Sequence, residues 1–189
     1  MVGVLSLTSR VSALLITILV SVTLATNATS ASPEDINKSR EQAALALIQF
    51  PWQQLNYEIV FMSPRQGYRA MTFPAKHRIE IYARPADSPL LLAYDIAHEL
   101  AHAIDLSFNT QETRQKWMKL RGINPATPWF GCDACSDFKT PSGDFAETFA
   151  LLLLGPGHFS GRIAPPPSSG QIPLLGAFFP KGFIPAPPQ

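Results

Sequence analysis

Two histidines and a glutamate with the spacing of a metal site stand in the sequence His-Glu-Leu-Ala-His at residues 98–102. On an α-helix successive residues are about 100° apart, so His98 and His102 share one face and Glu99 is offset from them. Histidines at this spacing can both reach one tetrahedral zinc ion, while the offset glutamate reaches a water molecule on that ion. The spacing therefore predicts a hydrolytic zinc site in which Glu99 is the general base that takes the proton of this water.

The residues around this motif favour a metal over a pair of buried histidines without one. All five ionisable residues of the predicted helix 88–106 fall within an arc of about 120°, and Leu, Ile and Ala fill most of the remainder. Asp95 and Asp105 are the two further carboxylates in this arc. Charged groups in apolar surroundings need partners or a metal ion, so we expect one zinc ion bound here.

A third ligand besides His98 and His102 is expected, because a catalytic zinc takes three protein ligands and leaves one position open. Asp105 lies one turn after His102, where its short side chain suits an acceptor for the N–H of a ligand imidazole. Glu147 is the better ligand, because it lies on a separate predicted helix, 144–154, that can bring a carboxylate across the site. Asp144, one turn before Glu147, could orient a ligand histidine or cap that helix.

Two segments of the chain together resemble the gluzincin zinc metallopeptidases. They are His-Glu-Leu-Ala-His-Ala-Ile-Asp at 98–105 and Gly-Asp-Phe-Ala-Glu-Thr-Phe-Ala at 143–150. The resemblance is closest to small catalytic domains of the anthrax-lethal-factor type and covers residues 77–155. Members of the family commonly have a tyrosine or histidine near the glutamate helix that stabilises the oxyanion. Here all four tyrosines precede the motif and His158 is the only later histidine, so this donor is unassigned.

The resemblance implies a role for each residue of the two motifs. His98, His102 and Glu147 would be the zinc ligands, and Glu99 the general base. It implies a small zincin-like domain with an endopeptidase activity on peptide or protein substrates. It also implies that the strand before the active helix, at 77–84, binds extended peptide by strand addition.

The patterning of the rest of the chain predicts one small α+β domain over residues 32–160. A short mixed or antiparallel sheet is expected to pack on the active-site helix and the glutamate helix. Alternating apolar residues and turn residues predict the strands, while caps, prolines and apolar periodicity predict the helices. Helices are expected at 33–49, 88–106, 110–120 and 144–154, and strands at 56–62, 68–73 and 77–84.

The two ends of the chain have different compositions from the domain. Residues 1–31 hold one arginine, a short apolar run and several small residues, which is typical of a secretory signal peptide cleaved between Ala25 and Ala31. We therefore expect a secreted or periplasmic protein without stable membrane insertion; an uncleaved membrane anchor is the alternative. Residues 161–189 are rich in proline and show no periodic pattern, so an extended or disordered tail is expected from about Ile163.

The cysteines and the charge limit the other classes of function. Cys132 and Cys135 are the only two cysteines, and in an exported protein this pair favours a structural disulfide over a redox or second zinc site. The formal net charge is +1, from 15 Lys and Arg against 14 Asp and Glu. A charge so close to zero gives no field that would attract nucleic acid or an anionic membrane.

The sequence leaves two classes of function to compare. The first is an exported zinc endopeptidase that acts on a peptide or protein substrate. The second is a catalytically silent, zinc-containing binding module, which only the unassigned oxyanion donor supports. The presence of Glu99 speaks against this second class, because a structural zinc site needs four ligands and no base. The proline-rich pattern of the tail is too generic to assign it a docking role.

Overall fold

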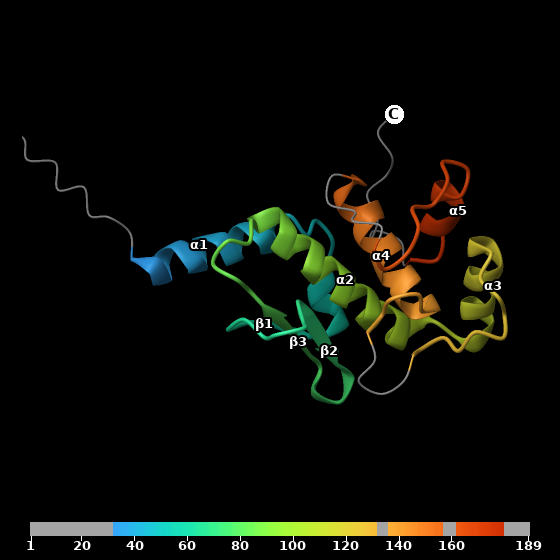
Figure 1. Ribbon diagram of the computed structural model, residues 1–189, viewed down its shortest axis with the longest axis horizontal. Coiled ribbons are helices and arrows are strands. Elements are labelled where there is room, and N and C mark those ends of the chain that lie inside the picture. The colour runs from blue at the N-terminus through green and yellow to red at the C-terminus, as the bar shows by residue number, and fades with distance from the viewer. Residues whose placement is uncertain (1–31, 132–135, 157–161, 180–189) are drawn as a thin grey trace, which may run out of the picture. The chain divides into compact units, whose positions relative to one another are not determined.

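The computed structural model describes residues 32–131, 136–156 and 162–179. The predicted signal segment and the two cysteines lie outside these ranges, so both predictions stay untested. The elements in chain order are α1 (Pro33–Ala46), η1 (Trp52–Leu55), β1 (Glu58–Met62), β2 (Ala70–Phe73), η2 (Pro74–Lys76), β3 (Arg78–Tyr82), α2 (Pro89–Phe108), α3 (Gln111–Arg121), α4 (Pro141–Leu154) and α5 (Ile172–Gly176) (Figure 1). The α+β class is confirmed. Among the described helices, none has the length and apolar character needed to cross a membrane.

The three strands form one mixed sheet in the order β1-β3-β2. The middle strand, β3, runs parallel to β1 and antiparallel to β2, with Ile79 opposite both Ile59 and Thr72. Ile79 and Ile81 point to the same face and are fully buried, as the alternation in this segment predicts. The expectation that this strand binds peptide by strand addition is wrong, because β1 and β2 already pair with both of its edges.

Helix α2 lies between the sheet and α4 (Figure 1) and contacts α1 as well. It begins where the Ser88 hydroxyl accepts a hydrogen bond from the Leu91 N–H at 3.2 Å and Pro89 occupies the first turn. Its apolar residues surround the helix rather than lining one stripe: Leu92, Ile96, Leu100, Ile104, Ala93, Ala97, Ala101 and Ala103 are all fully buried. Because α2 is covered on most sides, its few polar side chains are held in fixed positions with little access to water.

Helix α4 begins three residues earlier than the sequence analysis predicts. Thr140 is the N-cap, and its hydroxyl accepts a hydrogen bond from the Gly143 N–H at 2.9 Å. Pro141 fits the first turn because its missing N–H would have no partner there. Asp144 therefore lies inside the helix and does not cap it. Phe145 and Phe149 are fully buried on the side that faces the core.

The segment expected to be an extended tail instead folds onto the domain over residues 162–179. It contains the short helix α5, whose Leu175 is fully buried. The Phe179 ring lies 4.7 Å from the ring of Phe145 and 4.9 Å from that of Phe149, measured between centroids. Proline content predicted no regular structure here, but the apolar residues between the prolines supply enough surface to pack on α3 and α4.

Candidate metal centre

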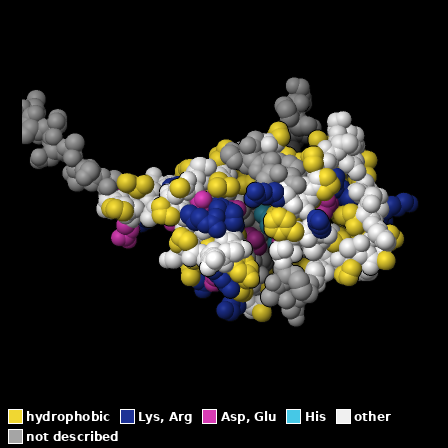
Figure 2. All heavy atoms as spheres, in the orientation of Figure 1, with side chains coloured by type: hydrophobic (Ala, Val, Ile, Leu, Met, Phe, Trp, Pro, Cys, Tyr) yellow, Lys and Arg dark blue, Asp and Glu magenta, His cyan; other side chains and the backbone are white. Residues whose placement is uncertain are grey.

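Helix α2 carries the three residues of the sequence motif into one place. His98 and Glu99 are buried, and His102 is partly exposed. The two imidazole rings lie with their centroids 5.0 Å apart at an angle of 76°. Figure 2 shows histidine surface near the middle of the visible face, with acidic side chains next to it.

A carboxylate that the sequence analysis did not single out meets both histidines. Oδ2 of Asp137 lies 3.3 Å from Nε2 of His98 and 2.9 Å from Nε2 of His102. Within the described ranges, these three residues are the only group of histidine, cysteine or acidic side chains whose ligand atoms lie close enough together, within 4.8 Å, to share one ion. The sequence gives little sign of it, because Asp137 stands in an irregular loop rich in Asp, Ser and Gly.

The opposite nitrogen of each ring contacts helix α4. Nδ1 of His98 lies 3.4 Å from Oε2 of Glu147, and Nδ1 of His102 lies 3.2 Å from the hydroxyl of Ser142. Glu147 is almost completely buried, and its second oxygen, Oε1, has no hydrogen-bond partner among the residues that the structure describes. Each imidazole thus lies between the Asp137 loop on one side and α4 on the other.

The local charge is negative, and the pKa values of the groups reflect this. Burial alone would lower the pKa of His98, but its contacts with Asp137 and Glu147 and the charge of Glu99 outweigh burial and raise that pKa to about 10. Burial also raises the pKa of Asp137, yet its contacts with His102 and His98 outweigh this and hold it well below its usual range. Three carboxylates surrounding two imidazoles favour bound positive charge.

The general-base candidate, Glu99, is fixed by the sheet. The hydroxyl of Thr72, on β2, lies 2.7 Å from Oε2 of Glu99 and 3.0 Å from the backbone oxygen of the same residue. This contact joins the edge strand to the active helix. It follows from the packing of α2 on β2, and no pattern in the sequence could have indicated it.

Asp105 and Asp144 have partners other than the histidines. Asp105 accepts hydrogen bonds from Nε and Nη2 of Arg114, both at 3.0 Å, and from Nε1 of Trp129 at 2.8 Å. Asp144 accepts from Nε and Nη2 of Arg121, both at 2.8 Å. In the part of the chain that the structure covers, neither carboxylate bonds to an imidazole. The expectation that they orient a ligand histidine therefore finds no support, and both instead tie α3 to the core.

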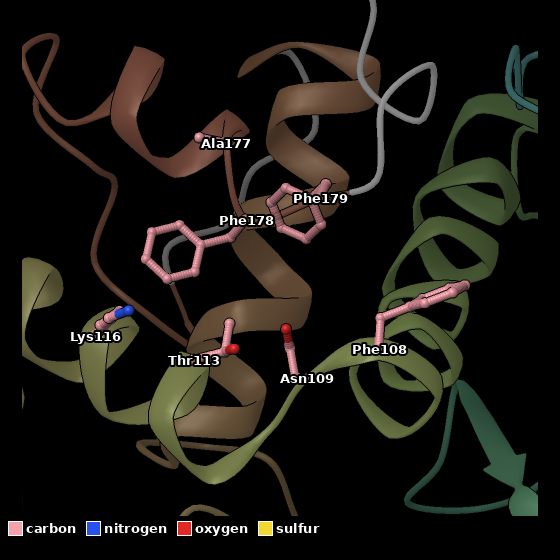
Figure 3. Close-up of a pocket in the computed structure, with 7 residues that line it drawn as sticks. All are labelled: Phe108, Asn109, Thr113, Lys116, Ala177, Phe178 and Phe179. Carbon is pink, nitrogen blue, oxygen red and sulfur yellow. The ribbon is translucent and has the colours of Figure 1, made fainter.

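A surface hollow lies apart from this cluster. Its volume is about 470 Å³, and its lining comes from the end of α2, from α3 and from the segment after α5 (Figure 3). The lining residues are Phe108, Asn109, Thr113, Lys116, Ala177, Phe178 and Phe179. None of them is a histidine, a cysteine or an acid, so this hollow contributes nothing to the metal-binding group.

Comparison of the chain with protein families, with curated proteins and with solved structures gives no match. The functional assignment therefore depends on the geometry of the cluster itself.

Proposed function

We propose that this protein is an exported zinc metallopeptidase of the zincin type, with its metal at His98 and His102 and with Glu99 as the general base. The observation that carries the proposal is the convergence of both histidine Nε2 atoms on one carboxylate oxygen, with Glu99 next to His98 on the same helix. Two histidines with a purely structural role would not need the Asp137 carboxylate in addition to Glu99 and Glu147.

The distances and the charges fit a zinc ion. Zinc binds nitrogen and oxygen ligands at about 2.0–2.2 Å in a tetrahedron, which separates neighbouring ligand atoms by about 3.3–3.5 Å. The Nε2 to Oδ2 separations of 3.3 and 2.9 Å are equal to or slightly shorter than this. The buried carboxylate of Glu147, one oxygen of which has no partner among the described residues, also requires a compensating charge nearby. A divalent cation at the histidines supplies that charge.

In the proposed mechanism the protein's own residues hold and move one proton. A zinc ion bound here would supply a nucleophilic water at neutral pH and polarise the substrate carbonyl. The Glu99 carboxylate would accept a proton from that water and would then donate it to the nitrogen of the leaving amine. Thr72 keeps the carboxylate of Glu99 in one position through its hydroxyl group. Burial of Glu99 keeps bulk water from competing for this proton.

The edge of β2 offers a place for an extended peptide, instead of the predicted strand at 77–84. The backbone carbonyl of Arg69 accepts a hydrogen bond from the Tyr82 N–H at 2.8 Å, so the backbone polar groups of Arg69 point toward β3. In an antiparallel pair this pattern alternates, which turns the backbone N–H and C=O groups of Ala70 and Thr72 to the outer edge. A peptide that added to this edge would pass next to Glu99, because Thr72 contacts that residue.

The test compares metal content and peptide cleavage in the wild type and two variants. Glu99→Gln should keep its zinc, because Gln is the same size and Glu99 is not a ligand, but cleavage of a peptide library should fall by about 10²- to 10⁴-fold. His98→Ala should lose both zinc and cleavage. Cleavage by Glu99→Gln at the wild-type rate would overturn the mechanism. A zinc-loaded wild type that cleaves nothing in the library would instead support a silent zinc-binding module.

A further inference from the structure

We propose that Asp137, rather than Glu147, is the third protein ligand of the metal, and that Glu147 orients His98 through its Nδ1 atom. This inference rests on the zinc site proposed above. It changes the ligand set that the sequence motif implies and adds a residue outside both motifs.

The first argument is the direction of the two nitrogens of His98. An imidazole binds one metal ion through one nitrogen, and its other nitrogen points away from that ion. Nε2 of His98 faces Asp137, and Nδ1 faces Glu147. Asp137 and Glu147 therefore lie on opposite sides of the ring. Since His102 also turns Nε2 to Asp137, the ion that both histidines share lies on the Asp137 side.

The second argument is that the remaining nitrogens have the partners that metal-bound histidines need. A ligand histidine almost always donates its other N–H to a carboxylate, a carbonyl or a hydroxyl-type acceptor, which fixes the ring and its tautomer. Oε2 of Glu147 lies at ion-pair distance, 3.4 Å, from Nδ1 of His98, and the Ser142 hydroxyl lies 3.2 Å from Nδ1 of His102. Both partners come from α4, so one helix orients both rings.

The third argument is that the backbone of Asp137 is fixed. Its carbonyl accepts hydrogen bonds from the Thr140 N–H at 3.1 Å and from the Thr140 hydroxyl at 3.0 Å. Gly143 packs so closely on this peptide group that a β-carbon there would overlap the Asp137 carbonyl oxygen. Lys139 adds a bond from its N–H to the Ile163 carbonyl at 3.2 Å. The loop thus presents the Asp137 side chain to the histidines from a defined position.

The partial exposure of Asp137 is compatible with a catalytic site. Its side chain is 38 % exposed, whereas that of Glu147 is 2 % exposed. Three ligands, His98, His102 and Asp137, leave one position of a tetrahedral ion open. Because the Asp137 side chain reaches the protein surface, water and substrate can approach the cluster from that side.

The experiment measures zinc affinity by competition with a chelator, together with the visible absorption of the cobalt(II)-substituted protein. Asp137→Ala should weaken zinc binding by more than about 100-fold and change the cobalt spectrum, because a ligand is lost. Glu147→Gln keeps an oxygen that accepts from Nδ1, so it should weaken binding by about 10-fold and keep the wild-type spectrum, as changes behind a ligand typically cost 10- to 100-fold. Asp137→Asn, nearly the same shape, is measured beside Asp137→Ala, with circular dichroism as the check on folding.

Glu112→Gln, an exposed carboxylate on α3 that pairs with Lys116, is the control and should bind zinc like the wild type. Wild-type affinity in Asp137→Ala and Asp137→Asn, with a loss of more than about 100-fold in Glu147→Gln, would overturn the inference and leave the proposed peptidase intact. Comparable losses in both positions would also overturn it, since Glu147 would then bind the ion. A wild type that binds no zinc would refute the proposed function itself.

Discussion

Thr72 is the residue that connects the sheet to the proposed chemistry on α2. Its hydroxyl is 2.7 Å from the Glu99 carboxylate. Thr72→Val keeps the shape and removes this donor. A hydrogen bond to a charged group contributes about 1.5–3 kcal/mol, so the misplaced base should lower kcat by about 10- to 100-fold. Zinc affinity and KM should stay close to wild type, because within the described ranges the side-chain hydrogen bonds of Thr72 go to Glu99 and to none of the three proposed ligands.

Thr72→Ser is the matched control for this prediction. It retains the hydroxyl and should recover most of the activity in steady-state kinetics on the same peptide. If Thr72→Ser were as slow as Thr72→Val, the hydroxyl would not be the relevant group. An equal loss of zinc in the valine variant would mean that Thr72 supports the fold of the site rather than the position of Glu99.

At the residue scale, the sequence could predict what depends on spacing along one helix. His98, Glu99 and His102 are neighbours on α2, and helix geometry alone brings them together. Asp137 lies 35 residues after His102, in a loop without periodicity, so its approach depends on tertiary packing. Asp105 lies on the same helix as the histidines and at a suitable spacing, but both of its oxygens accept hydrogen bonds from Arg114 instead. Local spacing does not indicate such distant partners.

At the element scale, the first turn of α4 sets the position of the loop before it. Gly143 lies against the Asp137 peptide group. The Thr140 hydroxyl accepts a hydrogen bond from the Gly143 N–H, which caps the helix, and donates one to the Asp137 carbonyl. Gly143→Ala places a β-carbon where the Asp137 carbonyl oxygen stands, so the loop must move. We expect zinc affinity to fall, because a ligand position misplaced by even a fraction of an ångström loses much of its contribution.

Gly170→Ala is the control for this substitution. A β-carbon at Gly170 would meet no atom within 4 Å, so zinc affinity there should equal that of the wild type. Chelator competition measures both variants, and thermal unfolding checks that each is folded. Unchanged zinc binding in Gly143→Ala would show that the position of the Asp137 loop does not control the metal.

The elements themselves were largely predictable, and their arrangement was not. Strands β1, β2 and β3 differ from the predicted segments by at most two residues at each end, because alternation and turn residues are local signals. The order β1-β3-β2 is a long-range property. The family resemblance implies peptide binding along the strand at 77–84, whereas β3 lies in the middle of the sheet. The earlier start of α4 has a local signal, an N-cap threonine, Thr140, followed by Pro141 in the first turn.

At the scale of the whole domain, the C-terminal segment completes the core on which α3 and α4 pack. The ring of Trp117, from α3, lies 4.8 Å from that of Phe145 and 6.0 Å from that of Phe179. Gln171 donates to the Leu120 carbonyl at 2.7 Å, and Arg121 donates to the Pro165 carbonyl at 2.6 Å. Since α4 carries the two residues that face the histidine Nδ1 atoms, this packing also supports the metal centre.

Two neighbouring leucines of α5 test this role with the same substitution. Leu175 is fully buried in the core, and Leu174 is 54 % exposed. Leu175→Ala should lower the free energy of unfolding by about 2–5 kcal/mol, because it removes buried methyl groups and leaves a cavity. Leu174→Ala should change it by no more than about 0.5 kcal/mol, as is usual at the surface. Urea unfolding of chelator-treated protein measures both without the added stability that bound metal gives. No effect of Leu175→Ala would mean that residues 162–179 do not contribute to the stability of the core.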